Sequence, residues 1–361
     1  MLTPLQIGDL TAAIPIIQGG MGVGISLSGL ASAVANSGGI GVIATAGIGM
    51  SEPDFFSDFV EANMRGLRRE IRTAREKAEG IIGVNIMVAM TNYADMVRTA
   101  IEEGIDIIFS GAGLPLKLPQ YRPANSKTKL VPIVSSGRAA AMLCKQWKER
   151  FDCLPDAIVV EGPLAGGHLG FNKDNLTDPA YMLEKLIPEV LNAVRPFEEK
   201  YSQRIPVIAA GGIYTGADIL KFMELGAAGV QMGTRFVVTD ECDASATFKQ
   251  TYIEATPDDI TIIKSPVGMP GRVIRNDFVN AMNRGEKEPF QCPYHCIITC
   301  DFKNSPYCIA LALVQAQRGN FRHGFAFAGA NAWRSDKIMK VKELVASIVE
   351  EYEAAKLTLA H

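Results

Sequence analysis

The sequence predicts an α/β fold: an eight-stranded TIM (β/α)8 barrel with a smaller cap subdomain after strand eight. Short apolar runs that end near glycine alternate with stretches of helical periodicity between residues 14 and 236. The chain has 361 residues, 48% of them hydrophobic, enough for one barrel of about 250 residues and an appendage. We therefore expect a barrel over residues 1–255, a cap over residues 256–332, and a C-terminal helix within residues 333–361 that packs on the barrel.

The first half of the barrel follows from glycine-bounded apolar runs and from amphipathic stretches. Strands are predicted at residues 14–18, 39–45, 82–88 and 105–110, because these runs are apolar and short. Helices are predicted at residues 27–37, 55–79 and 93–103, where apolar residues recur at helical spacing. Consecutive parallel strands need such crossover helices, so this order favours a barrel.

The second half repeats the pattern. Strands five and six are predicted at residues 130–135 and 157–161, with helices at 138–150 and 178–199. Strands seven and eight fall in segments 206–213 and 229–236, joined by a helix over 215–226. Beyond residue 240 Pro, Gly and Cys become frequent, and helical spacing is intermittent until residues 337–355. This change marks the predicted cap.

Charge and composition exclude several classes of protein. The 36 basic and 39 acidic residues give a net charge of −3 without a block of like charge, so no nucleic-acid partner is expected. Residues 10–51 carry no charge, but their many glycines indicate buried strands rather than a membrane span. No signal peptide is recognised, so we expect a cytoplasmic protein with a small-molecule substrate and thiols rather than disulfides. A homodimer is left open.

Two glycine turns one barrel repeat apart indicate a bound phosphate. Ala209-Ala-Gly-Gly-Ile213 and Gln231-Met-Gly-Thr-Arg235 follow strands seven and eight. Glycine lets backbone amides face open space, and barrel enzymes often hold a cofactor phosphate at these two loops. The pattern predicts a phosphorylated cofactor such as FMN.

A histidine stands on the glycine-rich loop after strand six, in Ala165-Gly-Gly-His168. The carboxyl ends of barrel strands carry the reacting groups in characterised barrel enzymes. Imidazole titrates near neutral pH, so His168 can accept or donate a proton. The alternative is a structural role, in which His168 only forms a hydrogen bond to a carbonyl. The position of His168 favours catalysis.

These motifs, together with Ile16-Ile-Gln-Gly-Gly-Met21, Gly83-Val-Asn-Ile86 and Ser110-Gly-Ala-Gly113, resemble the nitronate monooxygenase (2-nitropropane dioxygenase) family. Flavin-dependent enoyl-acyl-carrier-protein reductases belong to the same superfamily. The resemblance implies a barrel that binds FMN, with His168 as the catalytic residue. The cofactor-binding residues that it implies are Gly20, Met21, Asn85, Glu161, Gly166, Gly167, Gly211, Gly212, Gln231, Met232, Gly233 and Thr234.

Two departures bear on the substrate. Monooxygenase members usually have Gln where this chain has Glu161, whereas the reductases have Glu. Ala328-Gly-Ala-Asn-Ala332 stands where the family tends to show Ala-Gly-Gln. The leading hypothesis is oxidative denitrification of nitronates or nitroalkanes to a carbonyl compound and nitrite. The alternative is NAD(P)H-dependent reduction of an enoyl thioester through FMN. A flavin-binding sensor and a flavin-free phosphosugar isomerase or synthase are further alternatives.

Four of the seven cysteines gather in the predicted cap, at Cys292, Cys296, Cys300 and Cys308, with His295 among them. Spacings of four would align three thiols on one helical face, and the fourth could complete a site for zinc or an iron–sulfur cluster. Neither spacing is a standard ligand signature, and free cysteine is often buried. Packed thiols are the favoured interpretation here, with a metal site as the alternative.

Overall fold

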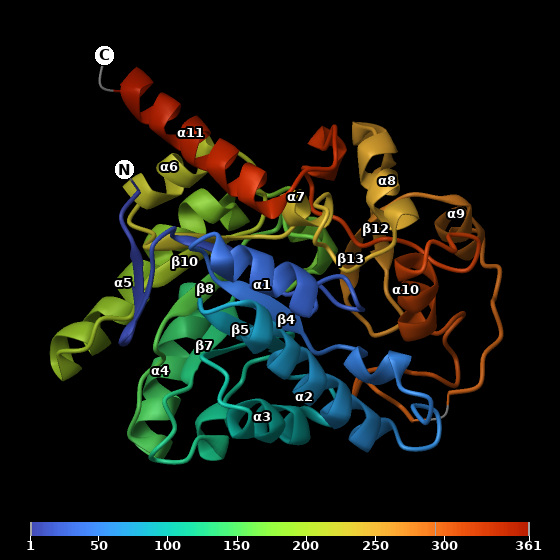
Figure 1. Cartoon of the computed structure of the whole chain (residues 1–361), viewed down its shortest axis with the longest axis horizontal. Helices are drawn as coiled ribbons and strands as arrows, with labels where there is room; N and C mark the ends of the chain where they lie inside the picture. The colour runs from blue at the N-terminus through green and yellow to red at the C-terminus, as the bar shows by residue number, and fades with distance from the viewer. Residues whose placement is uncertain (1, 293, 360–361) are drawn as a thin grey trace.

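The computed structural model describes residues 2–292 and 294–359 (Figure 1). Residues 1, 293, 360 and 361 lie outside this description. The predicted barrel segment is therefore described from residue 2, the cap without residue 293, and the C-terminal segment as far as residue 359.

Eight parallel strands form the central sheet. They are β3 (Ile16–Gln18), β4 (Gly41–Ala44), β5 (Ile82–Met87), β6 (Ile107–Gly111), β7 (Lys129–Val134), β8 (Ile158–Glu161), β10 (Val207–Ala210) and β11 (Gly229–Met232). The spatial order β3-β11-β10-β8-β7-β6-β5-β4 leaves β3 and β4 at the two edges. A parallel bridge between Ile17 and Ile40 joins these edges, with Ile40 N–H donating to Ile16 O at 3.0 Å. The predicted TIM barrel is confirmed.

Along each strand, successive side chains face the inside and the outside of the barrel in alternation. Ile17, Phe109 and Val159 face the barrel interior and share one apolar cluster with the hairpin β1 (Leu5–Ile7) and β2 (Leu10–Ala12). Asp9 of this hairpin pairs with Lys129 at the start of β7, at 2.5 Å. The hairpin therefore closes the amino-terminal end of the barrel, and the opposite end is free to hold a site.

Helices surround the wall, as the outward-facing apolar residues require. They are α1 (Ser28–Asn36), α2 (Phe59–Lys77), α3 (Tyr93–Glu102), α4 (Gly137–Phe151), α5 (Leu183–Tyr201), α6 (Gly216–Glu224) and α7 (Thr234–Val237). Helix α2 starts later than residue 55, because the Asp58 side chain accepts from Glu61 N–H and caps the helix there. Helix α11 (Val341–Leu359) packs against α6 so closely that a Cβ on Gly216 would stand 2.1 Å from the Tyr352 nitrogen.

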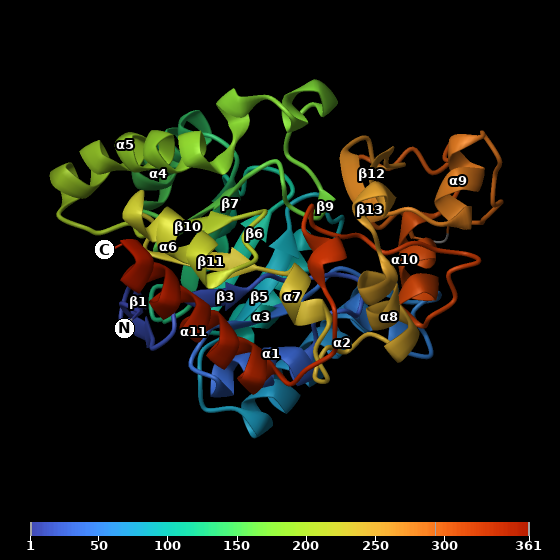
Figure 2. The same ribbon diagram turned by 90° about the horizontal axis from the view of Figure 1, so that it is seen from above.

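Beyond the barrel the chain forms α8 (Ala246–Glu254), β12 (Ile260–Lys264), β13 (Pro270–Ile274), α9 (Asp277–Asn283) and α10 (Ile309–Gln317). Figure 2 shows β12, β13, α9 and α10 grouped beside the barrel mouth. Strand β13 pairs antiparallel with both β12 and β9 (Gly167–His168), the short strand that follows β8. The cap sheet thus includes the histidine loop of the barrel. The predicted boundary between barrel and cap at residue 255 stays a proposal. No helix in the described residues is long and apolar enough to cross a membrane.

Candidate active site

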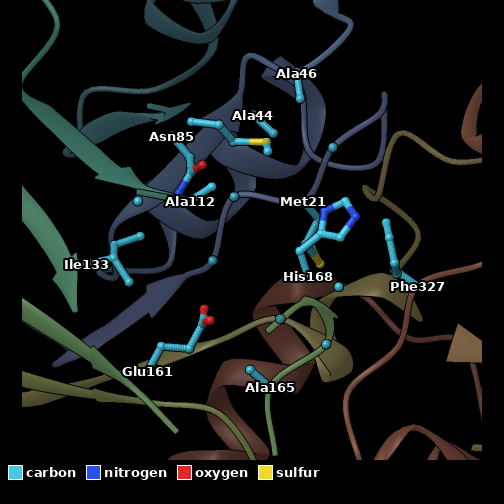
Figure 3. A pocket seen from close by; sticks show the side chains of 18 of the residues that line it. Met21, Ala44, Ala46, Asn85, Ala112, Ile133, Glu161, Ala165, His168 and Phe327 are labelled. Atoms are coloured by element: carbon cyan, nitrogen blue, oxygen red, sulfur yellow. The ribbon is translucent and has the colours of Figure 1, made fainter. Parts of the chain in front are cut away.

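One large cavity opens at the carboxyl-terminal end of the barrel, with a volume of about 580 Å³. All thirteen residues that the sequence predicts for the site line it: Gly20, Met21, Asn85, Glu161, Gly166, Gly167, His168, Gly211, Gly212, Gln231, Met232, Gly233 and Thr234. Figure 3 shows Asn85, Glu161 and His168 pointing into it from separate parts of the barrel. The structure therefore brings the predicted residues together, and their chemical roles stay predictions.

The two glycine turns form one corner of the cavity. Strands β10 and β11 are neighbours, so Gly211 and Gly212 after the first lie beside Gly233 and Thr234 after the second. Gly211 and Gly212 have φ angles of +96° and +82°, which favour glycine. Asn331 Nδ2 donates to Gly212 O at 2.6 Å and holds this turn from outside the barrel. The corner presents backbone and small side chains, a surface suited to a phosphate.

A second part of the cavity wall depends on a close approach between two strands. A Cβ on Gly20, after β3, would stand 2.3 Å from Asn85 Cβ on β5, so only glycine leaves room for the asparagine there. Met21 follows, and its N–H donates to Ser26 Oγ at 2.9 Å. This part of the wall places small and apolar residues around the amide of Asn85, a lining suited to a planar ring.

His168 lies where the barrel loop joins the cap sheet. Its Nε2 lies 2.8 Å from Ser265 Oγ, and its ring meets Phe327 edge-on, with centroids 4.9 Å apart. Register places His168 opposite Gly271 on β13. Burial lowers the pKa of His168 to about 4, so the imidazole is neutral near pH 7. The cap therefore fixes both the orientation and the charge of this side chain.

Arg272 on β13 supports the same loop from behind. Its Nη1 donates to Pro163 O at 2.7 Å and also to Ala165 O. The side chain is buried, and burial lowers its pKa to about 10. Since both acceptors belong to the turn between Glu161 and His168, Arg272 holds this turn in position.

Glu161 stands at the end of β8 and turns its carboxyl group into the cavity (Figure 3). Burial raises the pKa of Glu161 to about 7, because desolvation disfavours the carboxylate. The group is therefore divided between acid and carboxylate near neutral pH. It can donate a hydrogen bond as an acid or accept one as a carboxylate.

Sequence reasoning missed the residues that the cap contributes. Ser265, Phe327 and Arg272 belong to no recognised motif, and their proximity to His168 depends on the pairing of β13 with β9. Asn331 lies in the segment that departs from the family pattern, so that departure was a usable signal.

The structure corrects the predicted geometry of the cysteine segment. The expectation that Cys292, Cys296 and Cys300 share one helical face is wrong, because the described residues from 290 to 304 form no helix. His295 has a φ angle of +41°, which no α-helix accommodates. A tight loop takes the place of the helix.

Comparison with known proteins places the chain in a family. The family model for nitronate monooxygenase matches residues 4–351. The chain belongs to the nitronate monooxygenase family. A probable nitronate monooxygenase of Staphylococcus saprophyticus is 27% identical over 308 residues, covering 78% of this chain and 81% of that protein. The chain is thus an oxidoreductase family member with the predicted fold.

Two other similarities extend this picture. A (3aS,4S,5R,7aS)-5-hydroxy-7a-methyl-1-oxo-octahydro-1H-indene-4-carboxyl-CoA dehydrogenase of Mycobacterium tuberculosis is 30% identical over 273 residues, 76% of this chain. The chain spans 66% of the length of that relative. The structure of FabK from Thermotoga maritima matches with a TM-score of 0.73 and 28% identity, over 97% of this chain and 96% of that one. These similar proteins carry different names, so the substrate is a separate question.

Proposed function

We propose that this protein is an FMN-dependent oxidoreductase of the nitronate monooxygenase type, which converts a nitronate or nitroalkane to a carbonyl compound and nitrite. One observation supports it most: the glycine turns after β10 and β11 open onto the same cavity as His168. Strands β10 and β11 are the seventh and eighth of the barrel, after which barrel enzymes often bind a cofactor phosphate.

The lining residues fit FMN by their chemistry. The amides of Gly211, Gly212 and Gly233 and the hydroxyl of Thr234 would hold the phosphate, since all four residues line the cavity. The ring would lie among the remaining predicted residues: Gly20, Met21, Asn85, Glu161, Gly166, Gly167, Gln231 and Met232. When bound, FMN supplies an electron acceptor for an electron-rich carbon of the substrate.

His168 would move the proton in a reaction that starts from a nitroalkane. Its ring is neutral near pH 7, because burial lowers its pKa to about 4. When Nε2–H donates to Ser265 Oγ, Nδ1 carries the lone pair that accepts a proton from the carbon beside the nitro group. A substrate that arrives as a nitronate has already lost this proton, and His168 then only orients it.

A second candidate function is NAD(P)H-dependent reduction of an enoyl thioester through the same FMN. It is supported by Glu161, which the thioester reductases share, and by similarity to a CoA-ester dehydrogenase. In this reaction the Glu161 acid or His168 would donate a hydrogen bond to the thioester carbonyl.

Three measurements on the purified protein separate these functions. FMN released on denaturation, identified by its chromatographic retention, supports both, and a colourless protein that binds no added FMN contradicts both. Oxygen uptake with equivalent nitrite release on addition of a nitronate supports the leading proposal. Rapid anaerobic bleaching of the flavin by NADH or NADPH, without nitronate-dependent oxygen uptake, overturns it in favour of thioester reduction. A bound flavin with neither activity indicates a sensor.

A further inference from the structure

Arg272 on β13 is a buried cation without a carboxylate partner. The residue is only 7% exposed. The partly buried Arg235, by contrast, pairs with Glu351 Oε1 at 2.8 Å. In the part of the chain that the structure describes, no Asp or Glu pairs with Arg272, and its pKa is lowered by burial alone. A buried charge without a counter-charge destabilises a fold, so an anion bound beside Arg272 would relieve this cost.

The guanidinium acts on two peptides of the turn after β8. Its Nη1 donates to the carbonyls of Pro163 and Ala165. The carbonyl and the N–H of one trans peptide point in opposite directions. The N–H groups of these two peptides belong to Leu164 and Gly166, so both point away from Arg272. Leu164 and Gly166 line the large cavity. The cation therefore polarises two peptides whose N–H ends belong to the cavity wall.

The same turn packs directly against the phosphate corner. A Cβ on Gly211 would stand 3.1 Å from the Ala165 nitrogen, and a Cβ on Gly212 would stand 2.8 Å from Leu164 Cβ. The turn that Arg272 bonds from behind is thus in contact with both glycines of the predicted phosphate site. One layer of backbone separates the guanidinium from this corner.

A phosphate in this corner would need positive charge from beyond the cavity lining. A phosphate monoester carries close to two negative charges near pH 7. No Lys or Arg is among the described residues that line the cavity. Within residues 2–292 and 294–359, the four cap cysteines included, no three His, Cys, Asp or Glu side chains are grouped so as to hold a metal ion. Arg272 stays protonated near pH 7, because its pKa is about 10, and can supply this charge.

We propose that Arg272 is the counter-charge of the cofactor phosphate and acts on it through the turn after β8, as a positioning residue. The inference rests on the proposed function, which assigns FMN to this corner. It adds that the site selects the phosphorylated cofactor by means of a cation that does not line the cavity. A substrate anion near His168 is the competing partner for this charge, because Arg272 lies opposite Gly167 in the cap sheet.

The test compares FMN with riboflavin, which has the same ring and no phosphate. The flavin is removed from the purified protein, and quenching of flavin fluorescence on titration gives the Kd for each compound. Arg272→Gln keeps a side-chain N–H for the two carbonyls and loses the charge. It should weaken FMN binding by about ten- to a hundredfold and riboflavin binding by less than about threefold. Arg272→Lys keeps the charge and should keep most of the affinity for FMN.

Arg275→Gln is the matched control, because it removes the same charge from an exposed side chain just after β13 that lies 4.0 Å from Asp259. It should change neither Kd. Equal losses of FMN and riboflavin affinity in Arg272→Gln would overturn the proposal and leave Arg272 as a support of the turn. The proposal also fails if that variant binds FMN normally but, once loaded with FMN, binds a nitronate anion more weakly, since the charge then serves the substrate.

A second measurement needs no variant. Inorganic phosphate should raise the Tm of the flavin-free wild-type protein above its value in chloride at equal ionic strength, because phosphate binds only the folded corner. Absence of this rise overturns the proposal even if Arg272→Gln fails to fold. Failure of the proposed function is a separate result: the wild-type protein would bind FMN more tightly than riboflavin and show no oxygen uptake with a nitronate.

Discussion

The barrel rim and the cap contribute to the candidate active site in different ways. The rim supplies Gly211, Gly212 and Gly233 from turns directly after strands, and each is part of a local sequence motif. The cap supplies Ser265 and Phe327, which reach His168 only because β13 pairs with the loop after β8. In the proposed function, cofactor binding would therefore depend on local backbone geometry, whereas the orientation and charge of the imidazole depend on tertiary contacts. Substitutions in the two regions should therefore separate binding from turnover.

The largest expected effect is on turnover. His168→Ala should lower kcat by about a hundredfold or more, the usual scale for a general acid or base. The flavin should stay bound, because the phosphate turns come from β10 and β11. Steady-state kinetics together with the flavin-to-protein ratio measure both quantities. Unchanged kcat would assign the proton transfer to another group, and loss of flavin would contradict the separation of the two regions.

Gly212→Leu should give the reverse pattern and weaken FMN binding by about ten- to a hundredfold, equivalent to about 1.4 to 2.7 kcal/mol. A Cβ at this position would stand 2.8 Å from Leu164 Cβ, and the side chain would intrude on the phosphate corner. Gly104→Leu is the matched control, because Gly104 also has a positive φ but no neighbour within 4 Å. Equal loss of FMN in both variants would show that backbone strain, and not the corner, explains the effect.

The variant Glu161→Gln tests the effect of burial on the pKa of this carboxyl group, with the free energy of unfolding as the readout. The folded pKa is raised to about 7, so the folded protein binds the proton more tightly than the unfolded chain. Proton binding therefore stabilises the folded protein, and this stabilisation is fully present below about pH 4.5 and is lost as the pH rises through about 7. As the pH rises over this window, the free energy of unfolding of the flavin-free variant should therefore gain about 1 kcal/mol relative to flavin-free wild type. This gain is smaller than the full pKa shift implies, because the carboxyl group opens onto the cavity.

Urea unfolding of both proteins at a series of pH values measures this difference. Burial lowers the pKa of His168, so this group makes the free energy of unfolding rise with pH over a lower range. Both proteins share this contribution, so it cancels when they are compared at one pH. Glu79→Gln, at an exposed position, is the control and should show no such gain. A pH-independent difference for Glu161→Gln would contradict the raised pKa.

The contrast also explains what could be predicted from sequence. All eight strands follow from the sequence, because an apolar run and the turn after it lie together in the chain. The thirteen residues that line the site are those that the family resemblance of short motifs implies. Strands β12 and β13 and helix α10 were not predicted, since their apolar residues pack in a small separate core with irregular spacing. The contact of Ser265 with His168 spans 97 positions and has no local signal. The spacing of Cys292, Cys296 and Cys300 suggested one helical face, because spacing alone does not reveal the left-handed turn at His295.

The smallest expected effect concerns that long-range contact. Ser265→Ala removes the hydroxyl 2.8 Å from His168 Nε2 and should lower kcat about three- to tenfold with little change in KM or in flavin content, since one hydrogen bond contributes about 1 kcal/mol. Ser265→Thr keeps the hydroxyl and should recover most of the activity. Thr299→Val is the control, because Thr299 Oγ1 donates to Val267 O at 2.9 Å in the same cap without touching the imidazole. If Ser265→Ala and Thr299→Val lower kcat equally, the cap acts on His168 through its overall rigidity rather than through this hydroxyl.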